Sequence, residues 1–127
     1  MPEGPEIRRA ADRLSHVLCG QSLTDVYFFS EELKAFEKIL KGSRVEAIVT
    51  RGKALLTSLD SGYTIYSHNQ LYGRWNIVKA GHFPRTKRSL RMALDTHSHR
   101  ALLFSASDIN VLQSEVIEDH PFLAKIG

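Results

Sequence analysis

The sequence predicts a mainly β (α+β) fold, in which an antiparallel β-sandwich is flanked by two helices. Two observations carry this prediction. The N-terminal stretch repeats apolar residues at helical spacing, and a shorter stretch of the same kind follows it. Most of the remaining chain consists of short segments rich in Val, Ile, Tyr, Phe and Thr, separated by turn residues. Many short strands at near-regular spacing are typical of an antiparallel sandwich or barrel.

The first helix is expected at residues 5–18, and Gly20 just beyond it supplies a stop. Pro5 suits the first turn, because its missing N–H would have no partner there. This helix would follow directly on a Pro-Glu terminus, Pro2-Glu3. The apolar residues of the stretch recur at three- and four-residue spacing: Ile7, Ala10, Ala11, Leu14, Val17 and Leu18.

A second, shorter helix is expected after Ser30, which would serve as its N-cap. Gly42 would end this helix. Its apolar positions are Leu33, Phe36, Ile39 and Leu40.

The rest of the chain is strand-like, with turns such as residues 60–62 (DSG) and 80–81 (AG) between the strands. No repeat, low-complexity tract or linker interrupts it, so a single domain over residues 1–127 is expected. The candidate strands are residues 23–29, 44–50, 54–59, 63–68, 74–79, 89–95 and 101–105.

Length and composition limit the class of protein. The 127 residues fit one domain, because compact domains most often hold roughly 100–150 residues. The single cysteine, Cys19, excludes an internal disulfide and a cysteine-rich zinc site. No apolar run approaches the roughly 20 residues needed to span a bilayer. We therefore expect a soluble protein in a reducing compartment, with no membrane partner.

Positive charge is unevenly distributed along the chain. Residues 1–94 hold 15 basic and 9 acidic side chains, whereas residues 95–127 hold 2 and 5. The stretch 61–94 contains no acidic residue at all. An acid-free basic stretch is typical of a phosphate-binding surface, although a solvated basic strand face would look the same. Its basic residues are Arg74, Lys79, Arg85, Lys87, Arg88 and Arg91.

Removal of Met1 would leave Pro2 with a free secondary amine. Such an amine condenses with a sugar aldehyde to a permanently cationic iminium, which acidifies the neighbouring C–H and promotes elimination. The amine attacks only when it is unprotonated, and its reference pKa of about 8 already lies near neutrality. A helix N-terminus would lower this pKa, whereas Glu3 would raise it. The alternative is that Pro2 reflects only a processing preference.

Two carboxylates follow Pro2 closely. Glu3 is placed to act as a general acid on the same substrate carbon. Glu6 falls in the first helical turn, where the helix dipole stabilises a carboxylate, and Gly4 lets a ligand approach closely. First-turn glutamates are also ordinary capping residues, so these residues alone leave catalysis open.

Taken together, the motifs resemble those of the formamidopyrimidine-DNA glycosylase/endonuclease VIII family. They lie, in family order and across essentially the whole chain, at residues 1–12, 50–56, 66–73, 105–108 and 120–123. The chain is more similar to the endonuclease VIII branch, which removes oxidised pyrimidines. It carries HNQLY at residues 68–72 and SDI at residues 107–109, where the purine-directed branch differs.

The resemblance implies a bifunctional DNA glycosylase and abasic-site lyase of base-excision repair. Pro2 would attack C1′ of the damaged nucleoside while Glu3 donates a proton to the sugar, with Glu6 as a supporting carboxylate. The iminium would drive β-elimination of the 3′ phosphate and then δ-elimination of the 5′ phosphate. Lys53 matches the family's essential lysine, on the turn after residues 51–52, where it would grip a phosphate and donate protons. This chemistry requires no metal or redox cofactor.

Further residues would contact the DNA. Gln70, Leu71 and Tyr72 resemble the residues that fill the gap left when a lesion is extruded from the duplex. Without the resemblance, a turn with buried Leu71 and Tyr72 would be the simpler interpretation. His68 is expected to be structural or to lie near a phosphate. Lys125 stands where endonuclease VIII has a DNA-contacting arginine, and it keeps the charge without the bidentate fork.

The resemblance also bears on domains and partners. Residues 1–127 correspond to the N-terminal catalytic domain, so the helix-two-turn-helix domain and the zinc finger, with the family's zinc site, are expected to be absent. The expected partner is double-stranded DNA with oxidised pyrimidines or abasic sites, bound by a monomer in the bacterial cytoplasm at the nucleoid. Two alternatives remain: an impaired remnant that binds DNA non-specifically, and a tautomerase with a proline base, which the β-rich pattern and Lys53 disfavour.

The run His97-Ser98-His99 could place two histidines on one strand face. No third metal ligand is evident, so a polar turn between strands is expected and no metal site is assigned.

Overall fold

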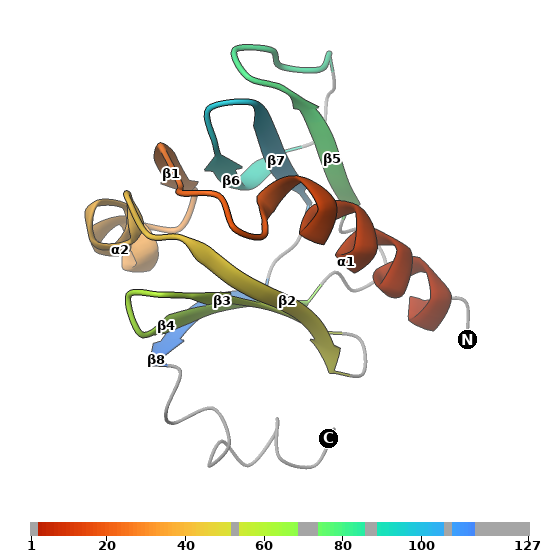
Figure 1. The fold of residues 1–127 in the computed structure, drawn as a ribbon, viewed down its shortest axis with the longest axis horizontal. Helices are drawn as coiled ribbons and strands as arrows, with labels where there is room; N and C mark the ends of the chain where they lie inside the picture. Colours follow the sequence, from red (N-terminus) through yellow and green to blue (C-terminus); the bar gives the residue numbers. More distant parts are fainter. Residues whose placement is uncertain (1–2, 52–53, 69–73, 86–88, 106–107, 114–127) are drawn as a thin grey trace.

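The computed structural model describes residues 3–51, 54–68, 74–85, 89–105 and 108–113 of the 127-residue chain. Over these residues the chain forms two four-stranded antiparallel sheets with two α-helices (Figure 1). The predicted fold class, an antiparallel β-sandwich flanked by two helices, is therefore confirmed. The elements in chain order are α1 (Glu3–Leu18), β1 (Asp25–Phe28), η1 (Glu31–Leu33), α2 (Lys34–Leu40), β2 (Val45–Arg51), β3 (Ala54–Leu59), β4 (Tyr63–His68), β5 (Arg74–Lys79), β6 (Leu90–Asp95), β7 (His99–Phe104) and β8 (Asp108–Gln113).

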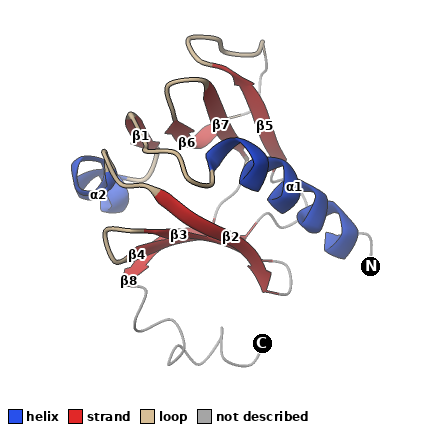
Figure 2. Ribbon diagram, in the orientation of Figure 1, coloured by secondary structure: helices blue, strands red, loops and turns tan. Residues whose placement is uncertain are grey.

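The strands divide into two sheets that face each other, as Figure 2 shows. Sheet I has the order β1-β6-β7-β5, and sheet II has the order β2-β3-β4-β8. The chain crosses between the sheets after β1, after β4 and again after β7. Two of these crossovers, the connections β4–β5 and β7–β8, matter for the candidate site below.

Helix α1 lies across the sandwich and packs mainly against β2, with further contacts to β3 and β7 (Figure 1). It begins two residues before the predicted start, because the first turn of a helix needs no N–H from Pro5. Its end is as predicted: Gly20 adopts a φ of +82°, and its N–H donates to the Val45 carbonyl at 2.8 Å. Its buried side chains are Ile7, Ala10, Ala11, Leu14 and Leu18.

One main hydrophobic core lies between the sheets and α1. It combines α1 residues with inward-facing side chains from both sheets, and it includes Leu33 and Leu40 from the second helical segment. Phe28, Met92 and Ile65 in this core are completely buried. Among the described residues, neither helix is long and apolar enough to cross a membrane.

The outer edge of β1 is closed by side chains from α2. The backbone N–H of Phe28 donates to Glu37 Oε2 at 2.7 Å, and Lys34 Nζ donates to the Phe28 carbonyl at 2.6 Å. Lys34 and Glu37 also form an ion pair at 3.6 Å, and the Lys34 ammonium lies 4.7 Å from the centre of the Tyr27 ring. An edge strand exposes unpaired backbone groups that invite association with other strands. These two side chains satisfy both groups of Phe28.

Replacing Glu37 by alanine is expected to lower the free energy of unfolding by about 1–2 kcal/mol, because the Phe28 N–H loses a charge-assisted acceptor. Glu32→Ala, at an exposed position in η1, is the matched control and should change stability by less than about 0.5 kcal/mol. Urea denaturation measures both. Equal stabilities of the two variants would show that the contact to Phe28 contributes nothing.

The second helical segment differs in detail from the prediction. It begins as the short 3-10 helix η1 and continues as α2, and Gly42 follows with a φ of +92°. Ser30 occupies the N-cap position, but its side chain makes no capping hydrogen bond. Ile39, expected on the apolar face, is instead 48% exposed.

The strand predictions are correct for β3, β4 and β5, and β2 and β6 are shifted or shortened by one residue. Strand β1 is shorter than the predicted 23–29, because Leu23 bonds instead to the Ser43 carbonyl. Strand β7 begins two residues before the predicted 101. Strand β8 was not predicted, because the polar Asp108, Asn110 and Gln113 hide the alternation of Ile109 and Val111, which pack against the core.

Candidate nucleic-acid interface

Four strand ends meet at one end of sheet II. Arg51, the last residue of β2, pairs with Ala54, the first residue of β3. Ala54 also pairs with His68, the last residue of β4, and His68 pairs with Asp108, the first residue of β8. Three connections therefore leave the sheet at this end: residues 52–53, 69–73 and 105–107. Connections gathered at one end of a rigid sheet are a common place for binding and catalytic residues.

The start of α1 lies toward the same end of sheet II. At its other end α1 is tied to the start of β2, because the Gly20 N–H donates to the Val45 carbonyl and the Val45 N–H donates to the Gln21 carbonyl. From there α1 runs back along β2, against which it packs. A 16-residue helix is about 24 Å long and a seven-residue strand about 23 Å. The first turn of α1 is thus directed to the Arg51 end, at the right of Figure 1.

This arrangement positions backbone segments that carry or flank the predicted site residues. Glu3 and Glu6 belong to the first two turns of α1, but only their backbone is described. Pro2 precedes that helix and lies outside the described residues. Lys53 also lies outside them, but the described residues on either side of it are the paired ends of β2 and β3.

The residues predicted to fill the gap left by an extruded base are Gln70, Leu71 and Tyr72. They lie outside the described residues, between His68 at the end of β4 and the start of β5. Their connection leaves from the same end of sheet II as the one with Lys53. Lys125 also lies outside the described residues. Three segments therefore meet at this end of sheet II: the start of α1, the connection that contains Lys53 and the connection that contains residues 70–72. Lys125 is given no position.

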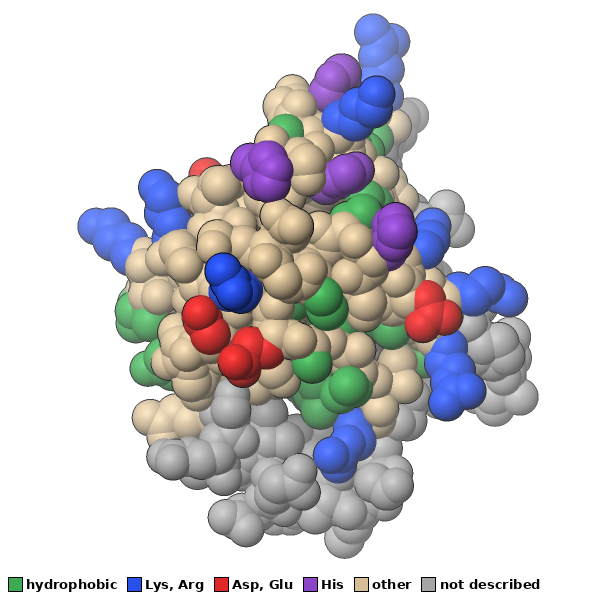
Figure 3. Space-filling view, in the orientation of Figure 1, with side chains coloured by type: hydrophobic (Ala, Val, Ile, Leu, Met, Phe, Trp, Pro, Cys, Tyr) green, Lys and Arg blue, Asp and Glu red, His purple; other side chains and the backbone are tan. Residues whose placement is uncertain are grey.

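Basic residues and the start of α1 lie near this end, together with the acidic residues Glu3 and Glu6 of the same helix. The N-terminus of α1 carries the positive end of the helix dipole, and Arg8 and Arg9 on its first turns are exposed. In Figure 3, Lys and Arg side chains lie around the right-hand end of the face shown, where Figure 1 places the start of α1, and acidic surface lies among them. A helix N-terminus with exposed arginines favours the approach of a phosphate.

The described basic residues of the acid-free stretch 61–94 lie on β5, on β6 and in the connection between these two strands. Lys79, at the end of β5, and Arg85 are exposed. Arg91 is half-buried: its guanidinium lies 4.5 Å from the centre of the Phe29 ring, and its Nε is buried without a hydrogen-bond partner. Lys87 and Arg88 lie outside the described residues. The charge of this stretch therefore belongs to more than one part of the surface.

Two details at the candidate site were not predicted. His68 is half-buried, and its Nδ1 is buried without a hydrogen-bond partner in the structure. Ser105, which opens the β7–β8 connection, has a φ of +63°, and its N–H donates to the Ser89 carbonyl at 2.8 Å. A positive φ is unfavourable for serine and is often found where a loop is held for function. No sequence signal marks it, since glycine or asparagine would be expected there.

His97 and Ser98 lie in the predicted turn between β6 and β7, whereas His99 is the first residue of β7. Thr96 organises this turn: its hydroxyl accepts a hydrogen bond from the His99 N–H at 3.1 Å, and its own N–H donates to the His99 carbonyl. His99 Nδ1 lies 2.9 Å from Ser98 Oγ. Within the described part of the chain, no three His, Cys, Asp or Glu side chains come together in a way that could hold a metal ion.

Comparison with known proteins places this architecture. Residues 1–107 match the model of the formamidopyrimidine-DNA glycosylase N-terminal domain. The chain is 54% identical over 127 residues to Endonuclease 8 of Pectobacterium carotovorum and 53% identical to Endonuclease 8 of Klebsiella pneumoniae. Both alignments cover 100% of this chain and 48% of the relative, so the chain spans about half the length of these curated relatives.

Solved structures agree on the fold. The formamidopyrimidine-DNA glycosylase of Lactococcus lactis, bound non-covalently to DNA that contains an abasic site, superposes with a TM-score of 0.80 at 16% identity, over 95% of this chain and 48% of that one. The same protein in complex with DNA containing an oxidised pyrimidine also gives a TM-score of 0.80, over 95% of this chain and 47% of that one. At this identity the likeness concerns the fold. The family's N-terminal domain is matched over residues 1–107, and curated relatives are more than half identical to the chain over its whole length. This chain therefore belongs to the formamidopyrimidine-DNA glycosylase family of base-excision repair, and within that family it is similar to Endonuclease 8.

Proposed function

We propose that this chain carries the catalytic residues of a bifunctional DNA glycosylase and abasic-site lyase that acts on oxidised pyrimidines. The observation that supports this most strongly is the convergence of the α1 start with the β2–β3 and β4–β5 connections at one end of the molecule. Pro2 and Glu3 on one side and Lys53 on the other belong to segments that are far apart in sequence, and the packing of α1 on β2 directs both segments to this end. The similarity to Endonuclease 8 supports the choice of pyrimidine lesions.

In the first step the unprotonated Pro2 nitrogen attacks C1′ of the damaged nucleoside, and the base leaves with the electrons of the glycosidic bond. The attached nitrogen gives up its proton to the departing base, and Glu3 donates a proton to the ring oxygen O4′, so that the C1′–O4′ bond breaks and the freed nitrogen lone pair forms the iminium. The start of α1 suits this step, because its dipole favours the unprotonated amine. Glu6, one turn along the same helix, would support Glu3 as a second carboxylate.

The elimination steps follow from the iminium. Loss of a proton from C2′ lets the electrons move to C3′, which expels the 3′ phosphate, and a second elimination expels the 5′ phosphate. Hydrolysis of the remaining iminium releases Pro2. Lys53 would hold a departing phosphate and supply protons. The iminium itself is the electron sink, so these steps need no metal or redox cofactor.

DNA binding would use the same end of the sandwich. Extrusion of the lesion costs a few kcal/mol of stacking, which Gln70, Leu71 and Tyr72 would partly replace by filling the gap. His68, at the end of β4, would lie near a phosphate, and Lys125 would add a phosphate contact. We propose that the chain acts as a monomer on double-stranded DNA in the bacterial cytoplasm, and that the relatives' second half supplies further contacts.

Strand cleavage tests this proposal. A labelled duplex with one oxidised pyrimidine, such as thymine glycol, and a duplex with one abasic site are each incubated with the protein. We expect cleavage of both, with 5′ and 3′ phosphate ends, and much slower cleavage of a duplex with 8-oxoguanine. If the chain binds all duplexes equally, with an affinity that falls steeply with salt, and cleaves none, it is a DNA-binding remnant rather than an enzyme.

A further inference from the structure

The strand β5 presents an open edge beside a pocket formed with α1. In an antiparallel pair, residues bond alternately to the neighbouring strand and away from it. The Ala80 N–H donates to the Ser98 carbonyl, so the backbone groups of Ala80 face β7. Lys79, which pairs with His99, is the next residue along the strand, so its backbone groups face away from β7. The alternation then turns the backbone groups of Trp75 and Ile77 outward as well. We refer to the outward groups of these three residues as the β5 edge.

Strand β1, at the other edge of sheet I, shows the same alternation of backbone groups. Phe29 donates to the Arg91 carbonyl while Phe28 pairs with Met92, so the groups of Phe28 face outward, and Glu37 and Lys34 close them as described above. At β5, among the described residues, one outward group has a partner: the His82 N–H donates to the Lys79 carbonyl at 3.1 Å, which leaves the Trp75 and Ile77 groups and the Lys79 N–H open. Within the described residues, no group bonds to the outward N–H of Trp75, Ile77 or Lys79.

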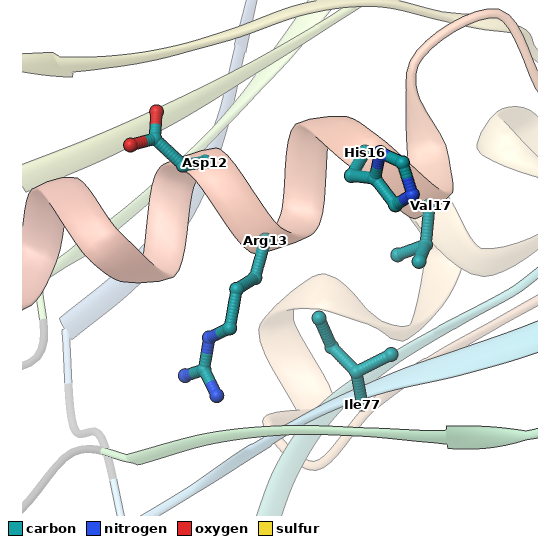
Figure 4. Close-up of a pocket in the computed structure, with 5 residues that line it drawn as sticks. All are labelled: Asp12, Arg13, His16, Val17 and Ile77. Atoms are coloured by element: carbon teal, nitrogen blue, oxygen red, sulfur yellow. The ribbon is translucent and has the colours of Figure 1, made fainter.

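A pocket of about 470 Å³ lies next to this edge (Figure 4). Arg13 and Val17 extend from α1 toward β5, and Ile77 extends from β5 toward the helix, whereas Asp12 points to the other side of α1 in this view. Val17 and Ile77 make an apolar floor, and the exposed Arg13 and His16 form its rim. We refer to this hollow, lined by Asp12, Arg13, His16, Val17 and Ile77, as the α1–β5 pocket.

We propose that the β5 edge and the α1–β5 pocket together bind an extended acidic peptide segment of a partner protein. The open edge would recognise the peptide main chain by adding it as a fifth strand to sheet I. The pocket would take one of its apolar side chains. Arg13, His16 and Lys79 would attract its carboxylates.

Charge alone would also suit a nucleic acid, but the β5 edge does not. Trp75 and Ile77 present carbonyl groups beside their N–H groups, and a phosphate backbone has no donors for them. A peptide strand supplies both donors and acceptors at the required spacing. The β5 edge runs away from the proposed catalytic end, because Trp75 lies next to the β4–β5 connection and Lys79 lies at the opposite end of the strand.

Binding is tested with a fluorescein-labelled decapeptide that alternates Glu and Val, and with the same peptide carrying Lys in place of Glu. Fluorescence anisotropy with the whole chain at 0.15 M salt should show binding of the acidic peptide only. Hydrogen exchange should show that this peptide protects the amides of Trp75, Ile77 and Lys79. Binding of neither peptide, or binding without this protection, would overturn the proposal.

Two pairs of variants locate the site. Lys79→Pro removes one outward N–H without removing a bond to β7, and Lys79→Gln controls for the lost charge. The proline variant should bind about five- to tenfold more weakly than the glutamine variant. Arg13→Glu should weaken binding about tenfold, whereas Arg8→Glu, the same change on the same helix outside the pocket, should not. Melting temperatures check folding, and the α1 pair tests the proposal even if the proline variant fails to fold.

Two further measurements test whether the site has a different occupant. If the chain dimerises in sedimentation experiments and protects β5 without peptide, the edge binds a second copy and the proposal is wrong. If undamaged duplex DNA displaces the peptide, the pocket belongs to the nucleic-acid surface and the proposal is again wrong. Neither result depends on strand cleavage, so the glycosylase proposal stands or fails separately.

Discussion

Glu3→Gln should lower the rate of base excision from a duplex with an oxidised pyrimidine by about 10²–10⁴-fold. Glutamine keeps the size and the backbone of the first turn of α1 but has no proton to give to O4′. Cleavage of a preformed abasic site should fall much less, because its sugar already opens to the aldehyde without help from an acid. Single-turnover rates on the two substrates measure this difference directly.

The matched control for Glu3 is Glu32→Gln, the same change at an exposed residue of η1. It should leave both rates unchanged. If Glu3→Gln slowed the two substrates equally, Glu3 would act on a step common to both, and its assignment as the acid that opens the ring would be wrong.

Lys53→Ala should lower the rate of abasic-site cleavage by about 10²–10³-fold, because a departing phosphate loses its positive charge and its source of protons. The β2–β3 pairing ends at Arg51 and Ala54 on either side of the turn, so the substitution alters a connection and leaves the sheet intact. The variant should therefore keep the melting temperature of the parent chain, and its binding to abasic DNA should show a salt slope smaller by about 1.

Lys53→Arg separates the two roles of this residue. Arginine keeps the charge but gives up no proton, so the salt slope should return while the cleavage rate stays low. Lys41→Ala, at an exposed lysine that follows the last residue of α2, should change neither quantity. Full recovery of cleavage in Lys53→Arg would show that charge alone is required there.

Much of the fold could be predicted because its local signals are strong. The apolar spacing of α1 and the stop at Gly20 describe a helix with one buried face, and β3, β4 and β5 are bounded by turn residues on the expected sides. Strand β8 could not be predicted, because its membership depends on pairing with β4 rather than on its own composition. The division into two sheets likewise depends on pairings between strands far apart in sequence.

The candidate site was predicted from motifs, which name residues but not their arrangement. No local signal in the sequence shows that the turn after Arg51 and the connection after His68 leave one end of the same sheet. That follows only from the register Arg51–Ala54–His68–Asp108. The positive φ of Ser105 and the open β5 edge could not be predicted for the same reason, because each depends on the backbone partners that the folded chain provides.

The central claim is that the Pro2 nitrogen forms a covalent iminium with an abasic site, and borohydride trapping tests it most directly. The chain, shown by intact mass to lack Met1, is incubated with labelled abasic-site DNA and sodium borohydride. We predict a stable protein–DNA adduct that maps to Pro2 by peptide mass, and no adduct when Met1 is retained or the N-terminus is acetylated. Failure of the intact, Met1-free chain to form any adduct, or an adduct that maps to a lysine, would contradict the mechanism.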